Sequence, residues 1–426
     1  DLIMDALNNV VQTILGMGSS VVLPIIIFTL ALVFRVKVKD AIVSGMTVGI
    51  GMIGIGLVTG LLGNSVGPAA QAMVERMGLN LTVIDAGWPA VSAATWAQPI
   101  AAVMIPVILI VNLIMLAFNW TKTLNIDIWN YWHMSAAAAT GYVVTGNFFF
   151  GILCGIIYTV IVQIIADKTA PAIQEYYGLE GISISTGSAQ GYAVLGIPIG
   201  HLIAKIPGIK NLDADPETIQ KRFGIFGEPM IMGFLIGALL AILAGYDITG
   251  ILQTSMTMAG IMFLLPRMVK ILMEGLIPIQ EAARKMLQQR YGDREIYLGM
   301  DAALATGSPA ALSTGLLMVP ITLFIAVILP GNRVLPFADL ATIPFFASMV
   351  VPSRKGNILH SVLTLTVVIT FALWMATDFA PAMTEMAKGI IEFPEGASQI
   401  TNFDTGGNIL NWIFLKFAQL YNSIFQ

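Results

Sequence analysis

The sequence predicts an all-α polytopic membrane protein. Of its 426 residues, 57% are hydrophobic and only 11% are charged, whereas an ordinary soluble domain carries about 25% charged residues. Too little charge remains to cover a water-facing surface of this size, and the mean hydropathy is +0.83. Lipid is therefore the expected solvent for most of the chain. The small net charge of -4 gives no reason to expect nucleic acid as a partner.

Long apolar runs predict the spans. A helix needs about 20 residues to cross the hydrocarbon, and by that rule we expect about nine to eleven spans in one domain over residues 1–426. Three further segments are short and broken by Gly, Pro, Ser and Asp, which predicts re-entrant hairpins or broken helices. These segments lie near 85–98, 183–204 and 336–351, and the long runs lie near 20–34, 41–63, 99–118, 135–166, 230–245, 249–265, 311–329 and 357–376.

Basic segments predict the cytoplasmic side. They occur at 35–40, at 205–224, at 267–294 and in the "PSRKGN" loop at 352–357. The apolar spacing within 267–294 is helical, so we expect an amphipathic cytoplasmic connector there. Two interpretations remain open for it, a solvated linker and a docking surface for a cytoplasmic partner.

Two stretches of the chain resemble each other, approximately 20–166 and 225–377. Each begins with a proline before an apolar run, and the loop before Asp40 is basic whereas its counterpart before Asp247 is not. Opposite charge bias in matching loops is what an inverted repeat gives, a pattern typical of transporters. The matching pairs are Pro24 and Pro229, Asp40 and Asp247, Asp85 and Asp301, and Asp127 and Asp339.

Two of these carboxylates are the strongest ligand-binding candidates. Asp85 and Asp301 each sit beside a broken segment, and carboxylates at membrane depth usually face a cavity. Trp88 and Trp96 flank small polar residues just after Asp85. Carboxylates accept hydrogen bonds from hydroxyls while indole faces cover C–H groups, so this combination favours a polyhydroxy ligand. The alternatives are a helix N-cap for Asp301 and a loop turn for Asp85.

Other polar groups have both a functional and a structural interpretation. Ser188 and Gln190 lie in a Gly/Ser/Thr segment. In the functional interpretation they present a hydroxyl and an amide to a ligand, and in the structural one they belong to a flexible loop. His133 precedes a run of alanines and is a binding or an interfacial histidine. Glu228 directly precedes Pro229, which also suits helix capping. Trp129 and Trp132 are typical of an interfacial aromatic belt.

No catalytic, metal or cofactor chemistry is predicted. The lone Cys154 lies in an apolar run and is expected to be an inert thiol. The three histidines are scattered, which excludes His-rich metal motifs, and no P-loop, Rossmann or nucleophile-elbow pattern appears in a suitable context.

Several motifs resemble a known family. "GPAAQAMVERMGLNLTVIDAGWPAVSAATWA", "NIDIWNYWHM", "KRFGIFGEP", "AILAGYDITGILQ" and "PGNRVLPFADLATIPFF" are similar to the membrane-embedded C components (enzyme IIC) of galactitol-specific phosphotransferase systems, in a group that includes ascorbate permeases. The resemblance implies a homodimer in the bacterial cytoplasmic membrane, with core and scaffold domains that move as an elevator. It further implies that the ligand is held by Asp85–Trp96, His133, Gly187–Gln190, Asp301 and Asp339–Thr342.

The implied activity is group translocation. The chain binds galactitol or a related polyol and carries it inward, and a separate B component, itself served by an A component, phosphorylates it. Gly187, Ser188 and Ala189 stand where the ascorbate branch has a His-Gln pair, which favours a neutral polyol. The alternative is an H⁺- or Na⁺-coupled secondary transporter of a polyol or of a sugar acid such as ascorbate. Because family members run on through another hydrophobic span, we expect a trimmed C-terminus.

Overall fold

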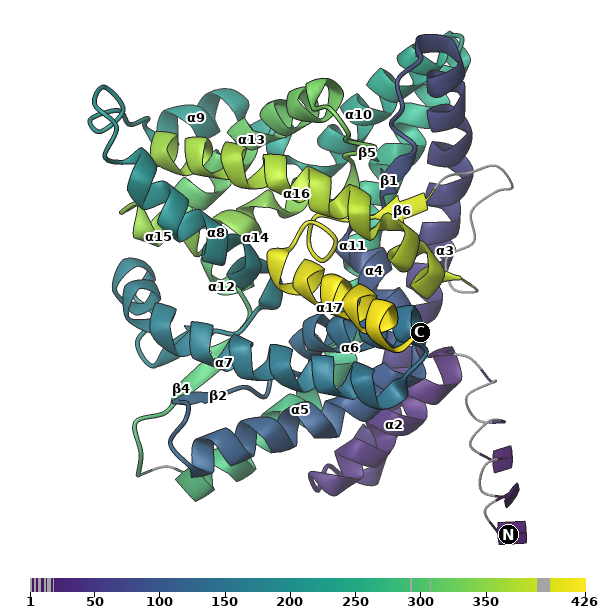
Figure 1. Ribbon diagram of the computed structural model, residues 1–426, viewed down its shortest axis with the longest axis vertical. Coiled ribbons are helices and arrows are strands. Elements are labelled where there is room, and N and C mark those ends of the chain that lie inside the picture. The colour runs from purple at the N-terminus through teal and green to yellow at the C-terminus, as the bar shows by residue number, and fades with distance from the viewer. Residues whose placement is uncertain are drawn as a thin grey trace.

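The computed structural model describes residues 19–291, 293–306, 308–388 and 399–426, with residues 2, 3, 5, 6, 9, 10, 13 and 17 (Figure 1). Within this part of the chain, six helices are long and apolar enough to cross a membrane. The all-α polytopic prediction is confirmed. The six helices are α3 (Val38–Met77), α5 (Pro99–Ala117), α7 (Phe148–Tyr177), α11 (Ile248–Tyr291), α13 (Pro309–Ile328) and α16 (Ile358–Ala387).

The long helices number fewer than the nine to eleven spans estimated from the apolar runs. A seventh span results if the pair Pro216–Gly227 and Pro229–Ala244, bent by 62°, is counted as one. The remaining apolar runs form helices that are too short for a full crossing. The shorter elements are α2 (Ser19–Val33), α4 (Gly87–Trp96), η1 (Ile128–Asn130), α6 (Tyr131–Thr145), α8 (Gly187–Ile203), α9 (Pro216–Phe223), η2 (Gly224–Gly227), α10 (Pro229–Ala244), α12 (Ala303–Thr306), η3 (Ala338–Thr342), α14 (Ile343–Ala347), α15 (Val350–Ser353) and α17 (Ile409–Phe425).

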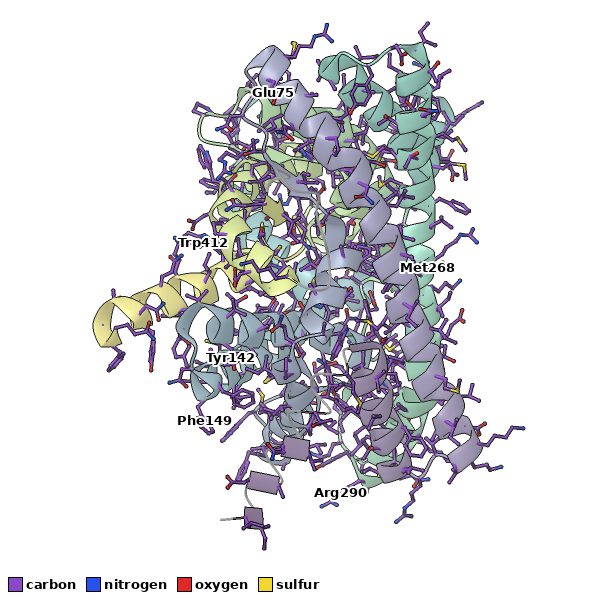
Figure 2. The ribbon with its side chains drawn as sticks, turned by 90° about the vertical axis from the view of Figure 1, so that its right-hand side faces the viewer. Glu75, Tyr142, Phe149, Met268, Arg290 and Trp412 are labelled. Carbon is purple, nitrogen blue, oxygen red and sulfur yellow. The ribbon has the colours of Figure 1, made fainter. Side chains whose placement is uncertain are left out.

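The two longest helices, α3 and α11, pack against each other along one side of the molecule (Figure 2). Glycine makes this approach possible, since small residues let membrane helices come close. A Cβ on Gly51 would lie 2.7 Å from the Cβ of Leu272, and one on Gly275 would lie 2.8 Å from the Ser44 carbonyl oxygen. The segment 267–294 is therefore not a separate connector in its described residues, because its first 25 residues form the second half of α11. Its cytoplasmic location stays a prediction.

Two small parallel sheets sit where the broken segments meet. One has the order β5-β1-β6 and the other β2-β4-β3. In each sheet the central strand comes from one half of the chain and both flanking strands from the other half, so the two halves interlock. The strands are β1 (Val83–Asp85), β5 (Val334–Leu335), β6 (Gln399–Thr401), β2 (Thr123–Leu124), β4 (Tyr297–Met300) and β3 (Ile182–Ile184).

Nearly the same order of elements occurs twice along the chain, with α14 and α15 together in the place of α6. The series α2–α3–β1–α4–α5–β2–η1–α6–α7–β3–α8 is followed by α10–α11–β4–α12–α13–β5–η3–α14–α15–α16–β6–α17. This correspondence extends beyond 20–166 and 225–377, because β3–α8 and β6–α17 also match. The inverted relation of the two halves stays a prediction.

Candidate functional site

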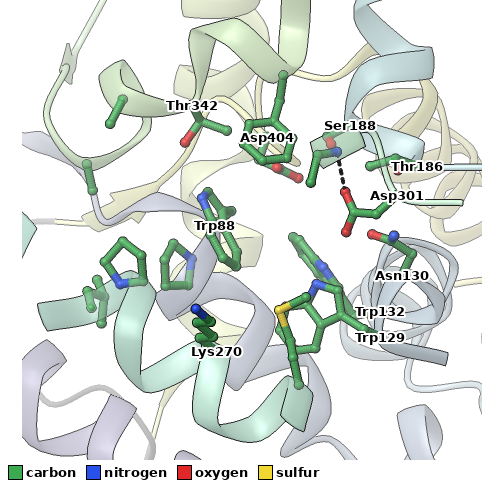
Figure 3. A pocket seen from close by; sticks show the side chains of 18 of the residues that line it. Trp88, Trp129, Asn130, Trp132, Thr186, Ser188, Lys270, Asp301, Thr342 and Asp404 are labelled. Carbon is green, nitrogen blue, oxygen red and sulfur yellow. Dashed lines mark hydrogen bonds between the residues drawn. The ribbon is translucent and has the colours of Figure 1, made fainter. Parts of the chain in front are cut away.

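A cavity of about 460 Å³ lies between the two sheets and α11 (Figure 3). This volume falls in the usual range for small-molecule sites. Because the strands of each sheet are parallel, their carboxyl ends meet at one edge, where ligands of such sheets typically bind. Each strand is followed by a residue that lines the cavity, namely Trp88 after β1, Trp129 after β2, Thr186 after β3, Asp301 after β4, Thr342 after β5 and Asp404 after β6.

Three tryptophans form an aromatic wall. The ring centroids of Trp88 and Trp129 lie 6.1 Å apart at an interplanar angle of 72°, and those of Trp129 and Trp132 lie 6.5 Å apart. Trp129 and Trp132 are buried. The wall offers flat apolar faces of the kind that cover the C–H side of a carbohydrate-like ligand.

Asp301 provides a carboxylate in the cavity lining. It is half-buried, and one of its oxygens accepts a hydrogen bond from the backbone N–H of Ala303 at 2.9 Å. Figure 3 shows Asn130 next to it. The nearby Thr186 hydroxyl accepts from the N–H of Ala302 at 2.8 Å and fastens this turn to the end of β3. The carboxylate thus has a fixed backbone position and faces the cavity.

His133 and Asp404 form a second polar group in the lining. The Nδ1 atom of His133 lies 3.1 Å from the Asn130 carbonyl oxygen. That oxygen can only accept, so Nδ1 carries a hydrogen. The Nε2 atom lies 3.3 Å from Asp404 Oδ1, yet neither atom has a hydrogen-bond partner among the described residues. Both side chains are buried and line the cavity, where this pair lies within reach of a ligand hydroxyl.

A different pair of carboxylates, Asp85 and Asp339, is bonded mainly to the protein backbone. Asp85 accepts from the N–H groups of Gly87, Phe337 and Asp339 at 2.9–3.0 Å. Asp339 accepts from the N–H groups of Trp88, Phe403 and Asp404 at 2.8–3.0 Å and from the Thr342 hydroxyl at 3.2 Å. Both side chains are completely buried. Together they hold three lining residues in place: Trp88, Thr342 and Asp404.

Comparison with known proteins identifies the family. A family model described as "PTS system sugar-specific permease component" matches residues 13–396. The chain belongs to this family. It is 39% identical over 409 residues to the "PTS system galactitol-specific EIIC component" of Escherichia coli strain K12, covering 96% of this chain and 90% of that protein. The same protein of Escherichia coli O157:H7 matches with the same identity and coverage.

Five of the ten residues singled out from the sequence line the cavity of this permease component: Trp88, His133, Ser188, Asp301 and Thr342. The other five do not line it. Asp85 and Asp339 form the buried pair described above.

The remaining three have separate environments. Gln190 donates from its amide nitrogen to the carbonyl oxygens of Val162 and Ile184 at 3.0 and 2.9 Å. Trp96 is buried at the end of α4, with no hydrogen-bond partner for its indole nitrogen among the described residues. Glu228 is exposed at the start of α10, without a side-chain capping bond.

Several lining residues escaped the sequence analysis. The belt interpretation of Trp129 and Trp132 is wrong, because both are buried in the cavity wall. Asp404 lies in "TNFDTGGN", which resembles "ISTGSAQG" around Ser188 in its Thr-Gly pair and could have been found by that likeness. Thr186 belongs to that same Thr-Gly pair, whereas Asn130 and Lys270 carry no comparable signal. No group of three or more metal-ligating side chains occurs among the described residues.

Proposed function

We propose that this permease component binds galactitol or a closely related sugar alcohol in the cavity between Trp88 and Asp301 and carries it across the bacterial cytoplasmic membrane. The observation that supports this most is the composition of the lining. The lining combines the aromatic faces of three tryptophans with the polar groups of Asp301, Asp404 and His133. A linear polyol has C–H groups that pack on the aromatic faces and hydroxyl groups that hydrogen-bond to the polar groups.

The charges of the lining favour a neutral ligand over a sugar acid. Asp301 and Asp404 are the carboxylates in the lining, and Lys270 is its lysine. An anion such as ascorbate would approach both carboxylates, and like charges at short range are unfavourable. The small side chains of Gly187 and Ala189 beside Ser188 agree with a site that does not present a cation at this point.

The partners of the proposed activity follow from group translocation. Cys154 is a buried free thiol in α7, so we assign it no role as a phosphoryl carrier. We therefore infer that a phosphorylated B component, recharged by an A component, phosphorylates the bound polyol from the cytoplasm. A homodimer and an elevator motion of Asp301 and its neighbours relative to α3 and α11 are part of the same proposal.

Calorimetric titration of the purified component tests the ligand. Galactitol, two other hexitols, one pentitol and ascorbate are titrated separately, and we expect galactitol or another neutral polyol to bind most tightly. Tighter binding of ascorbate would overturn the assignment.

A transport assay tests the coupling. Vesicles that hold phosphoenolpyruvate and the soluble phosphotransferase proteins should accumulate polyol phosphate. Accumulation of free polyol driven by an ion gradient alone would show a secondary transporter instead.

A further inference from the structure

An apolar furrow separate from the polyol cavity runs between α10 and α13. It contains a cavity of about 480 Å³ whose lining is entirely apolar among the described residues. A smaller cavity of about 60 Å³ continues it toward Leu243 and Phe337 and shares Ile236, Leu239 and Leu323 with it. The larger cavity is lined by Phe223, Phe226, Met232, Leu235, Ile236, Leu239, Leu316, Leu317, Val319, Pro320 and Leu323.

The length of the furrow matches one leaflet of a bilayer. Its lining on α10 runs from Met232 to Leu243, which at 1.5 Å per residue is about 17 Å. Half of a hydrocarbon core of about 30 Å is about 15 Å. A polar ligand would lose its hydrogen bonds to water here without replacement, whereas a single acyl chain would fill the furrow without such a loss.

One end of the furrow is covered by α9 and η2. The Gln220 side chain donates to the Pro309 carbonyl oxygen at 3.3 Å, and the Ser313 hydroxyl donates to that of Pro216 at 3.3 Å, so α9 is fastened across the start of α13. Phe223 and Phe226 are each 48% exposed and face the furrow from this end. An amphipathic helix with exposed aromatic residues is typical of the membrane interface.

Two cations stand at the same end. Lys221 and Arg222 occupy the last turn of α9, next to Phe223. Both are exposed, and neither takes part in an ion pair or side-chain hydrogen bond with another described residue. Basic residues beside a groove between membrane helices are the usual partners of anionic lipid headgroups.

We propose that the furrow is a binding site for an anionic phospholipid, with one acyl chain between α10 and α13 and the phosphate at Lys221 and Arg222. The two cations lie at the α9 end of the furrow, where the headgroup would bind, and the apolar lining extends from there along α10, where the acyl chain would lie. The site stands independently of the polyol cavity, and the proposal holds whichever polyol is carried.

Native mass spectrometry of the delipidated full chain, supplied with phosphatidylglycerol or phosphatidylcholine, tests the proposal. Wild type should retain phosphatidylglycerol preferentially. Leu239→Trp, which places an indole in both cavities, should lose retention of both lipids. A double change of Lys221→Gln and Arg222→Gln should remove the preference, a loss of about thirtyfold if each cation contributes the usual amount near a membrane surface.

Matched controls separate the site from general lipid coating. Leu57→Trp replaces a leucine that is 73% exposed on α3 and outside the furrow, and a double change of Lys205→Gln and Lys210→Gln removes two other exposed lysines. Both controls should behave as wild type. Unchanged retention in Leu239→Trp, or equal losses in the variants and their controls, would overturn the proposal. A denaturant-unfolding midpoint like that of wild type verifies that the Leu239→Trp variant is folded.

Discussion

Asp301 and Asp85 occupy matching places in the two halves of the chain, yet their replacement by Asn should affect different properties. Asp301→Asn should weaken ligand binding, and Asp85→Asn should lower the stability of the fold. Asp301 faces the cavity and accepts the backbone N–H of Ala303. An asparagine can keep this bond with its amide oxygen. We therefore expect the free energy of unfolding to change by less than about 1 kcal/mol, while a charge-assisted bond to the polyol, worth about 1.5–3 kcal/mol, is lost. The affinity for galactitol should fall about tenfold to a hundredfold.

The same change at Asp85 removes an acceptor that the backbone needs. One carboxylate oxygen accepts from both Phe337 and Asp339 and the other accepts from Gly87. An asparagine oxygen can serve the first two as weaker neutral bonds, but its NH₂ group then faces the N–H of Gly87. A buried donor without a partner costs about 1–3 kcal/mol, and weakening two charge-assisted bonds adds a similar amount. The variant should be destabilised by about 2–6 kcal/mol.

Two measurements on each variant separate these effects. Denaturant unfolding in detergent gives the stability, and calorimetric titration with galactitol at a temperature where both variants are folded gives the affinity. Asp85→Asn should lose stability first, and Asp301→Asn should lose affinity alone. The reasoning is refuted if Asp85→Asn is as stable as wild type but does not bind galactitol, or if Asp301→Asn binds galactitol with wild-type affinity.

Three further predictions concern the steps after binding. Lys270→Gln removes the lysine of the lining and should slow phosphorylation of the bound polyol about tenfold or more. The polyol affinity, measured by calorimetry, should stay within a few fold, because the phosphoryl group needs a cationic partner and the neutral polyol does not. Cys154→Ser should leave phosphorylation-coupled uptake nearly intact, since the thiol is buried in α7; abolished phosphotransfer with retained binding would show a phosphocysteine in this chain. Neutralising Arg354 and Lys355 should slow phosphorylation by the B component more than it weakens polyol binding, and the difference should shrink in 1 M salt, where the Debye length is about 3 Å; labelling of a cysteine at position 355 from outside only would contradict this orientation.

The sequence predicted the all-α polytopic class because apolar runs leave a local signal, but it overestimated the number of spans, since several of those runs form helices too short for a full crossing. Apolar length indicates a span, and Asp301 beside small residues indicates a break at membrane depth. The six strands could not be predicted, since each has only two to four residues and exists through pairing with distant segments. Val83, for example, pairs with Val334 and Gln399. The carboxylates could thus be singled out from the sequence. The sheet edges that bring them together could not be predicted.

The different environments of Asp85 and Asp301 could not be predicted, because they depend on contacts far along the chain. The partners of Asp85 at Phe337 and Asp339 lie about 250 residues away. Its local partner is the N–H of Gly87, two residues further on, just as Ala303 is the local partner of Asp301. The short-range hydrogen bonding of the two carboxylates is therefore the same. Sequence matching of the halves therefore finds both carboxylates but assigns both the same role.

This difference between the halves gives a physical reason for where the ligand binds. In the buried pair of Asp85 and Asp339, backbone N–H groups from three segments bind the carboxylates, and neither side chain lines the cavity. In the corresponding pair, Asp127 accepts instead from the side chains of Asn130 and Gln280, the latter on α11, and Asp301 keeps acceptor capacity toward the cavity. A buried carboxylate needs several hydrogen bonds to offset its desolvation. Where the backbone supplies fewer of these bonds, as at Asp301, the hydroxyl groups of a polyol can donate the others.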